Sequence, residues 1–274
     1  MSGAKIYKKI CFHDWEDKPV RGLNDSVVIV TGAGGGIGTA TCKRFAQEGA
    51  KVAAWDINTT ASKATAKAIN EAGGTAQAFT CDITDFTAVK ATAKNTESAL
   101  GPISVLVNNA GWDVFRPFLK TDPELWEKII AINLRGAIHT HYAILEGMVK
   151  RGAGRVVNVA SDAARVGSSG ESVYAACKAG IVGLSKTLAR EHARQGITFN
   201  VVCPGPTETD LLKSVLQQAA NPEKLSEAFR RAVPMGRLGQ PDDLPGTIAF
   251  LASEDAAYIT GQVISVSGGL TMAG

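Results

Sequence analysis

The fold of this chain is predicted from one segment near its start, Val27-Val28-Ile29-Val30-Thr31-Gly32-Ala33-Gly34-Gly35-Gly36-Ile37-Gly38. Val27 to Val30 form an apolar, β-branched run, which is typical of a strand buried on both faces. The glycines follow at once, and a helix is expected to run on to Gly49. Free N–H groups at a helix N-terminus bind phosphate, and glycine lets the backbone approach a pyrophosphate closely. The segment therefore predicts a dinucleotide-binding turn; the alternative is a glycine-rich turn without a ligand.

An acidic residue ends the next expected strand, 51–55. Asp56 lies about 20 positions beyond the glycines, where a carboxylate accepts hydrogen bonds from the adenosine ribose. It would repel a 2′-phosphate, and no Lys or Arg occurs between Thr31 and Gly38 to attract one. The pattern favours NAD over NADP; the alternative is a surface aspartate in a turn.

Strands and helices alternate along the rest of the chain. Helices are expected at 59–72 and 86–100, and strands at 76–81 and 105–107. This alternation predicts an α/β fold with a doubly wound parallel sheet, a Rossmann fold, and 274 residues suit a single domain. Further strands are expected at 155–159, 199–202 and 263–266.

Polar and turn motifs follow three of these strands. They are Asn108-Asn109-Ala110-Gly111, Ser161 and Pro204-Gly205-Pro206-Thr207. Ligands of parallel sheets bind at the carboxyl ends of the strands. We therefore expect the three motifs to meet at one edge of the sheet.

Tyr174 and Lys178 are expected on one helix, four residues apart and so on the same face. A nearby cation lowers the pKa of a phenol, so the pair could transfer a proton at neutral pH. The alternative is a packed ring beside a solvated amine.

Together these motifs resemble the short-chain dehydrogenase/reductase family over residues 24 to 274. The resemblance rests on Thr31-Gly-x-x-x-Gly36-x-Gly38, Asn108-Asn-Ala-Gly111, Asn133, Ser161, Tyr174-x-x-x-Lys178 and Pro204-Gly205. Gly32, Gly35 and Gly38 also fit the spacing of longer, sugar-epimerase-like relatives, but the short chain and the Asn-Asn-Ala-Gly motif argue against those.

The resemblance implies an NAD-dependent oxidoreductase that interconverts a secondary alcohol and its ketone. Tyr174 would be the general acid/base, Lys178 would hold the nicotinamide ribose, Ser161 would bind the substrate oxygen, and Asn133 would hold a water linked to Lys178. Tyr174 and Lys178 thus count among the cofactor contacts as well. The other implied contacts are Gly32, Gly36, Ile37 and Gly38 at the pyrophosphate, Asp56 at the ribose, Asp82, Ile83 and Asn109 on the adenine side, and Thr207 and Thr209 at the nicotinamide amide.

The substrate is expected to be a bulky or cyclic secondary alcohol. Residues 111–115, 161–171 and 202–207 resemble those of family members that oxidise a 2-hydroxycyclohexanecarboxyl-CoA thioester. Trp112, Phe115, Val166 and Met235 would form an apolar pocket. Cations that could hold the CoA diphosphate are Arg116, Arg165, Lys213, Lys224, Arg230 and Arg231; the alternative is that they are ordinary solvated charges.

Two segments lie outside the α/β pattern. Residues 1–23 are expected to be an N-terminal arm, dispensable for chemistry, with Phe12 and Trp15 packing on the protein. Residues 208–235 resemble the family's mobile substrate lid, and lids exclude water from a site.

The bulk properties restrict the class of protein. A net charge of +3 does not indicate nucleic acid or a membrane surface as a partner. Five scattered cysteines suit a cytoplasmic protein, and neither a membrane span nor a signal peptide is recognised. The four histidines show no metal-ligand spacing. Alternatives left open are a 3-oxoacyl thioester reductase, a general cyclic alcohol/ketone reductase and a catalytically silent NAD-binding regulator. The family resemblance implies a homotetramer.

Overall fold

The computed structural model describes residues 20–218 and 221–273. Within these residues, seven parallel strands form one sheet in the order β3-β2-β1-β4-β5-β6-β7. This confirms the doubly wound sheet of a Rossmann fold. The strands are β1 (Val27–Thr31), β2 (Lys51–Asp56), β3 (Thr75–Thr80), β4 (Ile103–Asn108), β5 (Gly154–Val159), β6 (Ile197–Pro204) and β7 (Val263–Val266).

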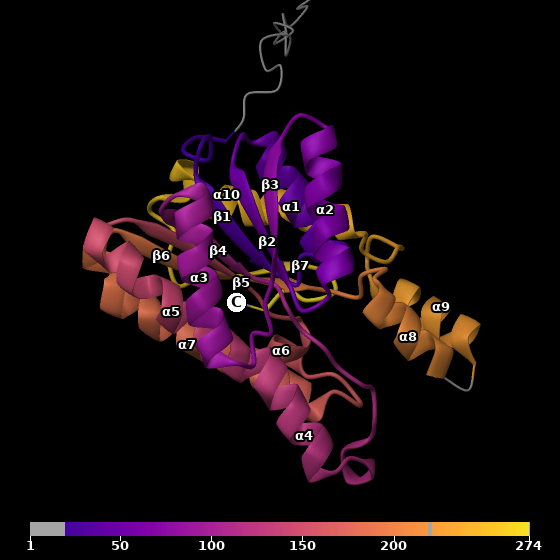
Figure 1. Ribbon diagram of the computed structural model, residues 1–274. Coiled ribbons are helices and arrows are strands. Elements are labelled where there is room, and N and C mark those ends of the chain that lie inside the picture. The colour runs from indigo at the N-terminus through magenta and orange to yellow at the C-terminus, as the bar shows by residue number, and fades with distance from the viewer. Residues whose placement is uncertain (1–19, 219–220, 274) are drawn as a thin grey trace, which may run out of the picture.

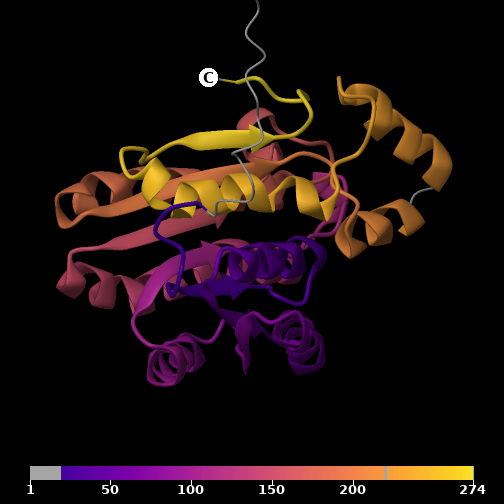
Figure 2. The ribbon, with the colours of Figure 1, turned by 90° about the horizontal axis from the view of Figure 1, so that it is seen from above.

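Helices cover both faces of the sheet, which Figure 2 shows between two helical layers. One layer holds α1 (Gly36–Gln47), α2 (Thr59–Glu71) and α10 (Pro245–Ala252), and the other holds α3 (Phe86–Leu100), α5 (Gly136–Arg151) and α7 (Ser172–His192). The remaining α-helices in the described part are α4 (Pro123–Ile130), α6 (Ala163–Val166), α8 (Asp210–Gln218) and α9 (Pro222–Ala232). Helices α8 and α9 project away from both layers (Figure 1).

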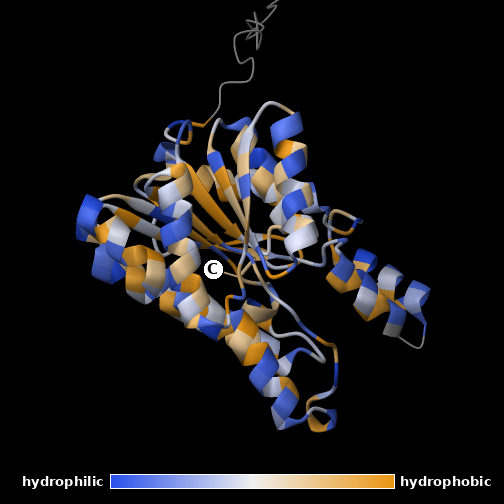
Figure 3. Cartoon of the chain, in the orientation of Figure 1, coloured by the Kyte–Doolittle hydropathy of each residue, from blue (hydrophilic) through white to orange (hydrophobic). Residues whose placement is uncertain are grey.

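The side chains of β1 show why its sequence is apolar throughout. Val28 and Val30 belong to the core under α1, with Phe45, whereas Val27 and Ile29 belong to the core under α3 and α5. All are buried, because successive strand residues point to opposite faces and both faces are covered. The central strands are accordingly hydrophobic in Figure 3, while charged residues lie on the outer helix surfaces.

The strand order reverses between β1 and β4, which are neighbours in the sheet. The chain continues from β1 to β2 on one side and from β4 to β5 on the other. Such a switch point leaves a crevice outside the carboxyl ends of the two strands, where ligands of this fold class bind.

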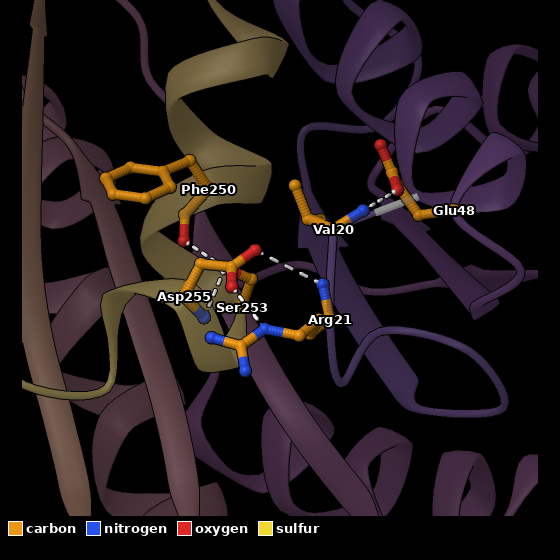
Figure 4. Close-up of polar contacts among 6 residues, drawn as sticks. All are labelled: Val20, Arg21, Glu48, Phe250, Ser253 and Asp255. Carbon is orange, nitrogen blue, oxygen red and sulfur yellow. Dashed lines mark hydrogen bonds and ion pairs between the residues drawn. The ribbon is translucent and has the colours of Figure 1, made fainter. Parts of the chain in front are cut away.

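The last residues of the expected N-terminal arm are bound to the domain (Figure 4). The N–H of Val20 donates to Glu48 Oε2 at 2.7 Å, and Nε of Arg21 donates to Asp255 Oδ1 at 2.6 Å. Leu23 is fully buried in the core. Residues 1–19, with Phe12 and Trp15, lie outside the described residues.

Candidate active site

A cavity of about 1170 Å³ opens at the carboxyl ends of the strands. It brings together the loops that follow β1, β2, β4, β5 and β6 and the start of α7. Residues 109–111, Ser161 and residues 204–207 all line it, so the three motifs predicted to converge do meet, and Tyr174 and Lys178 line it as well. Every cofactor residue expected from the sequence lines it too: Gly32, Gly36, Ile37, Gly38, Asp56, Asp82, Ile83, Asn109, Thr207 and Thr209.

Two glycines of the β1–α1 turn are required by geometry. Gly32 has a φ of +66°, which side-chain-bearing residues rarely adopt. A Cβ on Gly38 would collide with the carbonyl oxygen of Gly32, whereas a Cβ on Gly35 would find its nearest atom 3.5 Å away. No side chain therefore separates the backbone from the cavity at Gly32 and Gly38, so a pyrophosphate could approach the backbone closely there.

Asp56, the last residue of β2, is hydrogen-bonded to the turn between β1 and α1. One carboxylate oxygen accepts the N–H of Gly34 at 2.8 Å, and the other accepts the N–H of Asn58 at 2.8 Å. Both oxygens retain lone pairs, and the residue lines the cavity. The carboxylate can therefore accept a further hydrogen bond from a ligand.

The turns after β1 and β4 are tied to each other. The Thr31 hydroxyl accepts the N–H groups of Asn109 and Ala110 at 3.0 Å each. The side-chain amide of Asn109 donates to the carbonyls of Thr31 and Gly32, at 3.0 and 3.2 Å. The Asn-Asn-Ala-Gly segment thus holds the glycine turn in position.

Tyr174 and Lys178 project from one face of α7, as predicted. Nζ of Lys178 lies 5.5 Å from the centre of the Tyr174 ring and donates to the carbonyl of Val159 at 2.9 Å. Burial lowers the pKa of Lys178 to about 8. Lys178 is thus held on the β5 side of the cavity rather than against the phenol.

The prediction that Lys178 lowers the tyrosine pKa is wrong for this structure. Burial raises the pKa of Tyr174, the carboxylates of Glu171 and Asp113 raise it further, and a hydrogen bond with Ser161 opposes them. Desolvation and two nearby anions each disfavour a phenolate, and Lys178 is not among the groups that lower this pKa. Tyr174 therefore keeps its proton at neutral pH.

Asn133 lies beside the cavity rather than in its lining. It is buried in a π-helical turn, Ala131–Arg135, between α4 and α5. Its Oδ1 accepts the N–H of Trp112, and its Nδ2 donates to the carbonyls of Trp112 and Ile129. These bonds fix the loop after β4 next to Lys178; the water expected beside Asn133 stays a prediction.

Two acidic residues near Tyr174 were not singled out by the sequence. Asp113 is only 3% exposed, and Glu171 lines the cavity. Their carboxyl groups lie close enough to affect each other's pKa, and burial raises the pKa of both, that of Asp113 to about 7. Glu171 lies three residues before Tyr174 at the start of a helix, and this spacing could have predicted that the two side chains are neighbours. No pattern in the sequence around Asp113 predicts its contact with Glu171.

The expected substrate pocket is partly correct. Trp112, Phe115 and Val166 line the cavity, but Met235 does not and is 70% exposed. The lid adds apolar side chains that were not assigned to the pocket: Leu211, Leu212, Val215 and Phe229.

None of the six cations expected on the rim, outside the pocket, lines the cavity, so their contact with a CoA diphosphate stays a prediction. Lys213 pairs with Asp210, and Arg230 and Arg231 pair with Glu227. These are ordinary ion pairs between side chains three or four apart on a helix. Lys128 lines the cavity instead, with Nζ 3.9 Å above the ring of Trp112. The others that do not line it are Arg116, Arg165 and Lys224.

Three further properties hold for residues 20–218 and 221–273. None of the helices there is long and apolar enough to span a membrane. No group of three or more His, Cys, Asp or Glu side chains there could hold a metal ion. Cys42, Cys81, Cys177 and Cys203 are buried free thiols.

Comparisons with known proteins agree with this site. The family profile described as enoyl-(acyl carrier protein) reductase matches residues 32–271. Acetoacetyl-CoA reductase of Rhizobium meliloti is 39% identical over 89% of this chain and 97% of its own length. Human (3R)-3-hydroxyacyl-CoA dehydrogenase is 37% identical over 91% and 97%. The crystal structure of levodione reductase superposes with a TM-score of 0.87 at 33% identity, covering 90% of this chain and 97% of that one. The chain is therefore an oxidoreductase of the short-chain dehydrogenase/reductase family.

Proposed function

We propose that this protein is an NAD-dependent oxidoreductase that interconverts a secondary alcohol and its ketone, with Tyr174 as general acid/base. The observation that carries the proposal is the shared cavity. The phenol of Tyr174, the hydroxyl of Ser161 and the ammonium of Lys178 line the same space as the glycine turn. A catalytically silent regulator would have no need of this arrangement.

The cavity residues fit a nicotinamide dinucleotide. Gly32, Gly36, Ile37 and Gly38 would hold the pyrophosphate, and Asp56 the adenosine ribose. Asp82, Ile83 and Asn109 would hold the adenine side, and Thr207 and Thr209 the nicotinamide amide. When bound, the nicotinamide accepts or supplies the hydride.

The charges near Asp56 support NAD over NADP. Among the described residues that line the cavity, the cationic side chains are Lys128 and Lys178. Lys128 lies over Trp112 and Lys178 is bonded to Val159, so neither is placed to neutralise a phosphate beside Asp56. A 2′-phosphate there would face an unpaired carboxylate.

Side chains of this protein can supply and accept the proton that the substrate oxygen gains or loses. In ketone reduction, Tyr174 donates its proton to the carbonyl oxygen, since its phenol is protonated at neutral pH. Ser161 donates a hydrogen bond to the same oxygen as negative charge develops. In alcohol oxidation the proton moves the other way, so Tyr174 first loses its own proton and then accepts the proton of the carbinol.

The substrate we propose is a hydroxyacyl thioester or a cyclic secondary alcohol. The apolar lining from Trp112, Phe115, Val166 and the lid supports a bulky substrate. Sequence resemblance to 2-hydroxycyclohexanecarboxyl-CoA dehydrogenase favours a ring-bearing CoA thioester. The names of the two curated relatives favour a linear 3-hydroxyacyl or 3-oxoacyl thioester. A homotetramer in the cytoplasm is proposed on family resemblance, and light scattering after gel filtration tests the assembly.

NADH absorbance tests the proposal directly. The protein is mixed with NAD or NADP and with 3-hydroxybutyryl-CoA, 2-hydroxycyclohexanecarboxyl-CoA or cyclohexanol. We expect turnover with NAD, at least about tenfold more efficient than with NADP, a ratio equal to about 1.4 kcal/mol. No turnover with any alcohol and either cofactor would overturn the oxidoreductase mechanism, and equal use of NADP would overturn the cofactor assignment. Turnover of cyclohexanol as efficient as that of the thioesters would reject CoA recognition alone.

A further inference from the structure

The contact between Asp113 and Glu171 joins two loops at the substrate end of the cavity. Asp113 lies in the loop after β4, and Glu171 is the N-cap of α7. The same loops are also linked by the backbone, since the N–H of Arg116 donates to the carbonyl of Gly170 at 2.9 Å. The two carboxyl groups are therefore held together by the fold around them.

Few neighbouring groups offset the negative charge of Asp113 and Glu171. Both carboxyl oxygens of Asp113 are buried without a hydrogen-bond donor among the described residues. Glu171 receives a hydrogen bond from Ser168, and the nearby ammonium of Lys178 donates to Val159 rather than to either acid. Two carboxylates in contact repel each other unless they share a proton. Burial and mutual repulsion therefore favour keeping a proton on the pair, and the negative charge of both groups appears in full only when that proton leaves.

Glu171 presents this charge where the substrate must lie. It lines the cavity three residues before Tyr174, on the same face of the chain entering α7. Ser161 and Tyr174 mark the position of the reacting oxygen in the proposed mechanism. A substituent on the carbon next to the carbinol would consequently meet the carboxyl group of Glu171. An ester or thioester carbonyl is neutral at that position, whereas a free carboxylate is repelled.

We propose that Glu171 is a specificity-determining residue, positioned by Asp113, that makes the site select neutral hydroxy and oxo compounds, such as thioesters, over the matching free acids. This inference rests on the proposed function, which it narrows to a substrate class. It requires no CoA-binding cation.

The test compares one neutral and one anionic substrate with the same carbinol. We would measure kcat/KM with NAD for the N-acetylcysteamine thioester of 3-hydroxybutyrate and for free 3-hydroxybutyrate. The parent should favour the thioester. Glu171→Gln should reduce the thioester-to-acid ratio at least about tenfold, because it removes the charge and keeps the shape. Asp113→Asn should retain the ratio, because Glu171 then ionises alone and still carries a negative charge, and Glu171→Asp should retain it as well.

Asp210→Asn is the matched control. Asp210 is another carboxylate that lines the cavity, but it is solvent-exposed and paired with Lys213, so its charge is screened. Its loss should leave the ratio within about twofold. The melting temperature of each variant shows whether it is folded.

The outcomes separate the inference from the proposed function. A folded Glu171→Gln variant that turns over with an unchanged ratio overturns the inference and leaves the dehydrogenase standing. An equal fall in the ratio for Asp210→Asn also overturns it, because the selectivity would then come from general negative charge. No turnover by the parent with either substrate, or with the alcohols named above, would instead mean that the proposed function fails.

Discussion

The side-chain amide of Asn133 is hydrogen-bonded to both the N–H and the C=O of Trp112, at 3.1 and 2.6 Å. This contact joins the π-helical turn between α4 and α5 to the loop after β4. Gly111, next to Trp112, lies against both Asn133 and the ammonium of Lys178. A π turn inside a helix often marks a functional site, and here it directs one amide at the loop beside Lys178.

Replacing Asn133 with Ala should therefore reduce both stability and activity. It leaves the N–H and C=O of Trp112 and the carbonyl of Ile129 without their partner, which costs about 2–4 kcal/mol of unfolding free energy. The freed loop should lower kcat at least about tenfold, since small displacements near reacting groups are costly. Urea unfolding and steady-state kinetics measure the two effects. Asn58→Ala, which removes the N-cap of α2, is the control, with a loss of about 1 kcal/mol; a kcat equal to that of this control would contradict the positioning role.

Tyr174→Phe should abolish turnover and leave NAD affinity nearly unchanged. The ring still packs in α7, but the proton that must reach the substrate oxygen is gone, and general acid catalysis contributes about 10²–10⁴-fold. Stopped-flow turnover and NADH fluorescence titration separate the two properties. A variant that keeps a tenth of the parent kcat would refute the assignment of Tyr174 as general acid/base.

Asp56→Asn should narrow the preference for NAD over NADP by at least about tenfold. Asparagine keeps an oxygen acceptor for the N–H of Gly34 or Asn58 but removes the charge that repels a 2′-phosphate. Binding titrations of both cofactors measure the change. Asp82→Asn, in the same cavity, is the comparison, and an equal shift in both variants would show that the discrimination does not depend on Asp56.

Asp113→Asn should stabilise the protein most above pH 7. The folded pKa of Asp113 is about 7 and the ordinary value is 3.8, so between these values the folded state binds a proton that the unfolded state has lost. The contribution of Asp113 to stability therefore falls as the pH rises from about 4 to about 7. Asparagine removes this dependence. The unfolding free energy of the variant should exceed that of the parent by roughly 2–4 kcal/mol at pH 8, and the two values should approach each other near pH 4. Unfolding free energies across this range test the prediction; parallel curves would show that Asp113 does not titrate as stated.

Much of the fold follows from short-range patterns. Val27 to Val30 predict a strand covered on both faces, and Gly32 and Gly38 mark a turn where a side chain would not fit. The four-residue spacing of Tyr174 and Lys178 places them on one face of a helix, and Asp56 is placed by the length of one β-α-β unit. Each of these depends on backbone periodicity or on sterics within one unit, so the linear chain contains the necessary information.

The electrostatics of the site depends on the tertiary structure. The raised pKa of Tyr174 arises first from its burial, and then from Glu171 at the start of α7 and from Asp113 in a loop 61 positions before Tyr174. The lid arginines pair with Glu227 instead of facing the cavity, and Lys128 reaches it from α4. Burial and charge at a point are sums over every segment that the fold brings there, and sequence spacing does not record which segments those are.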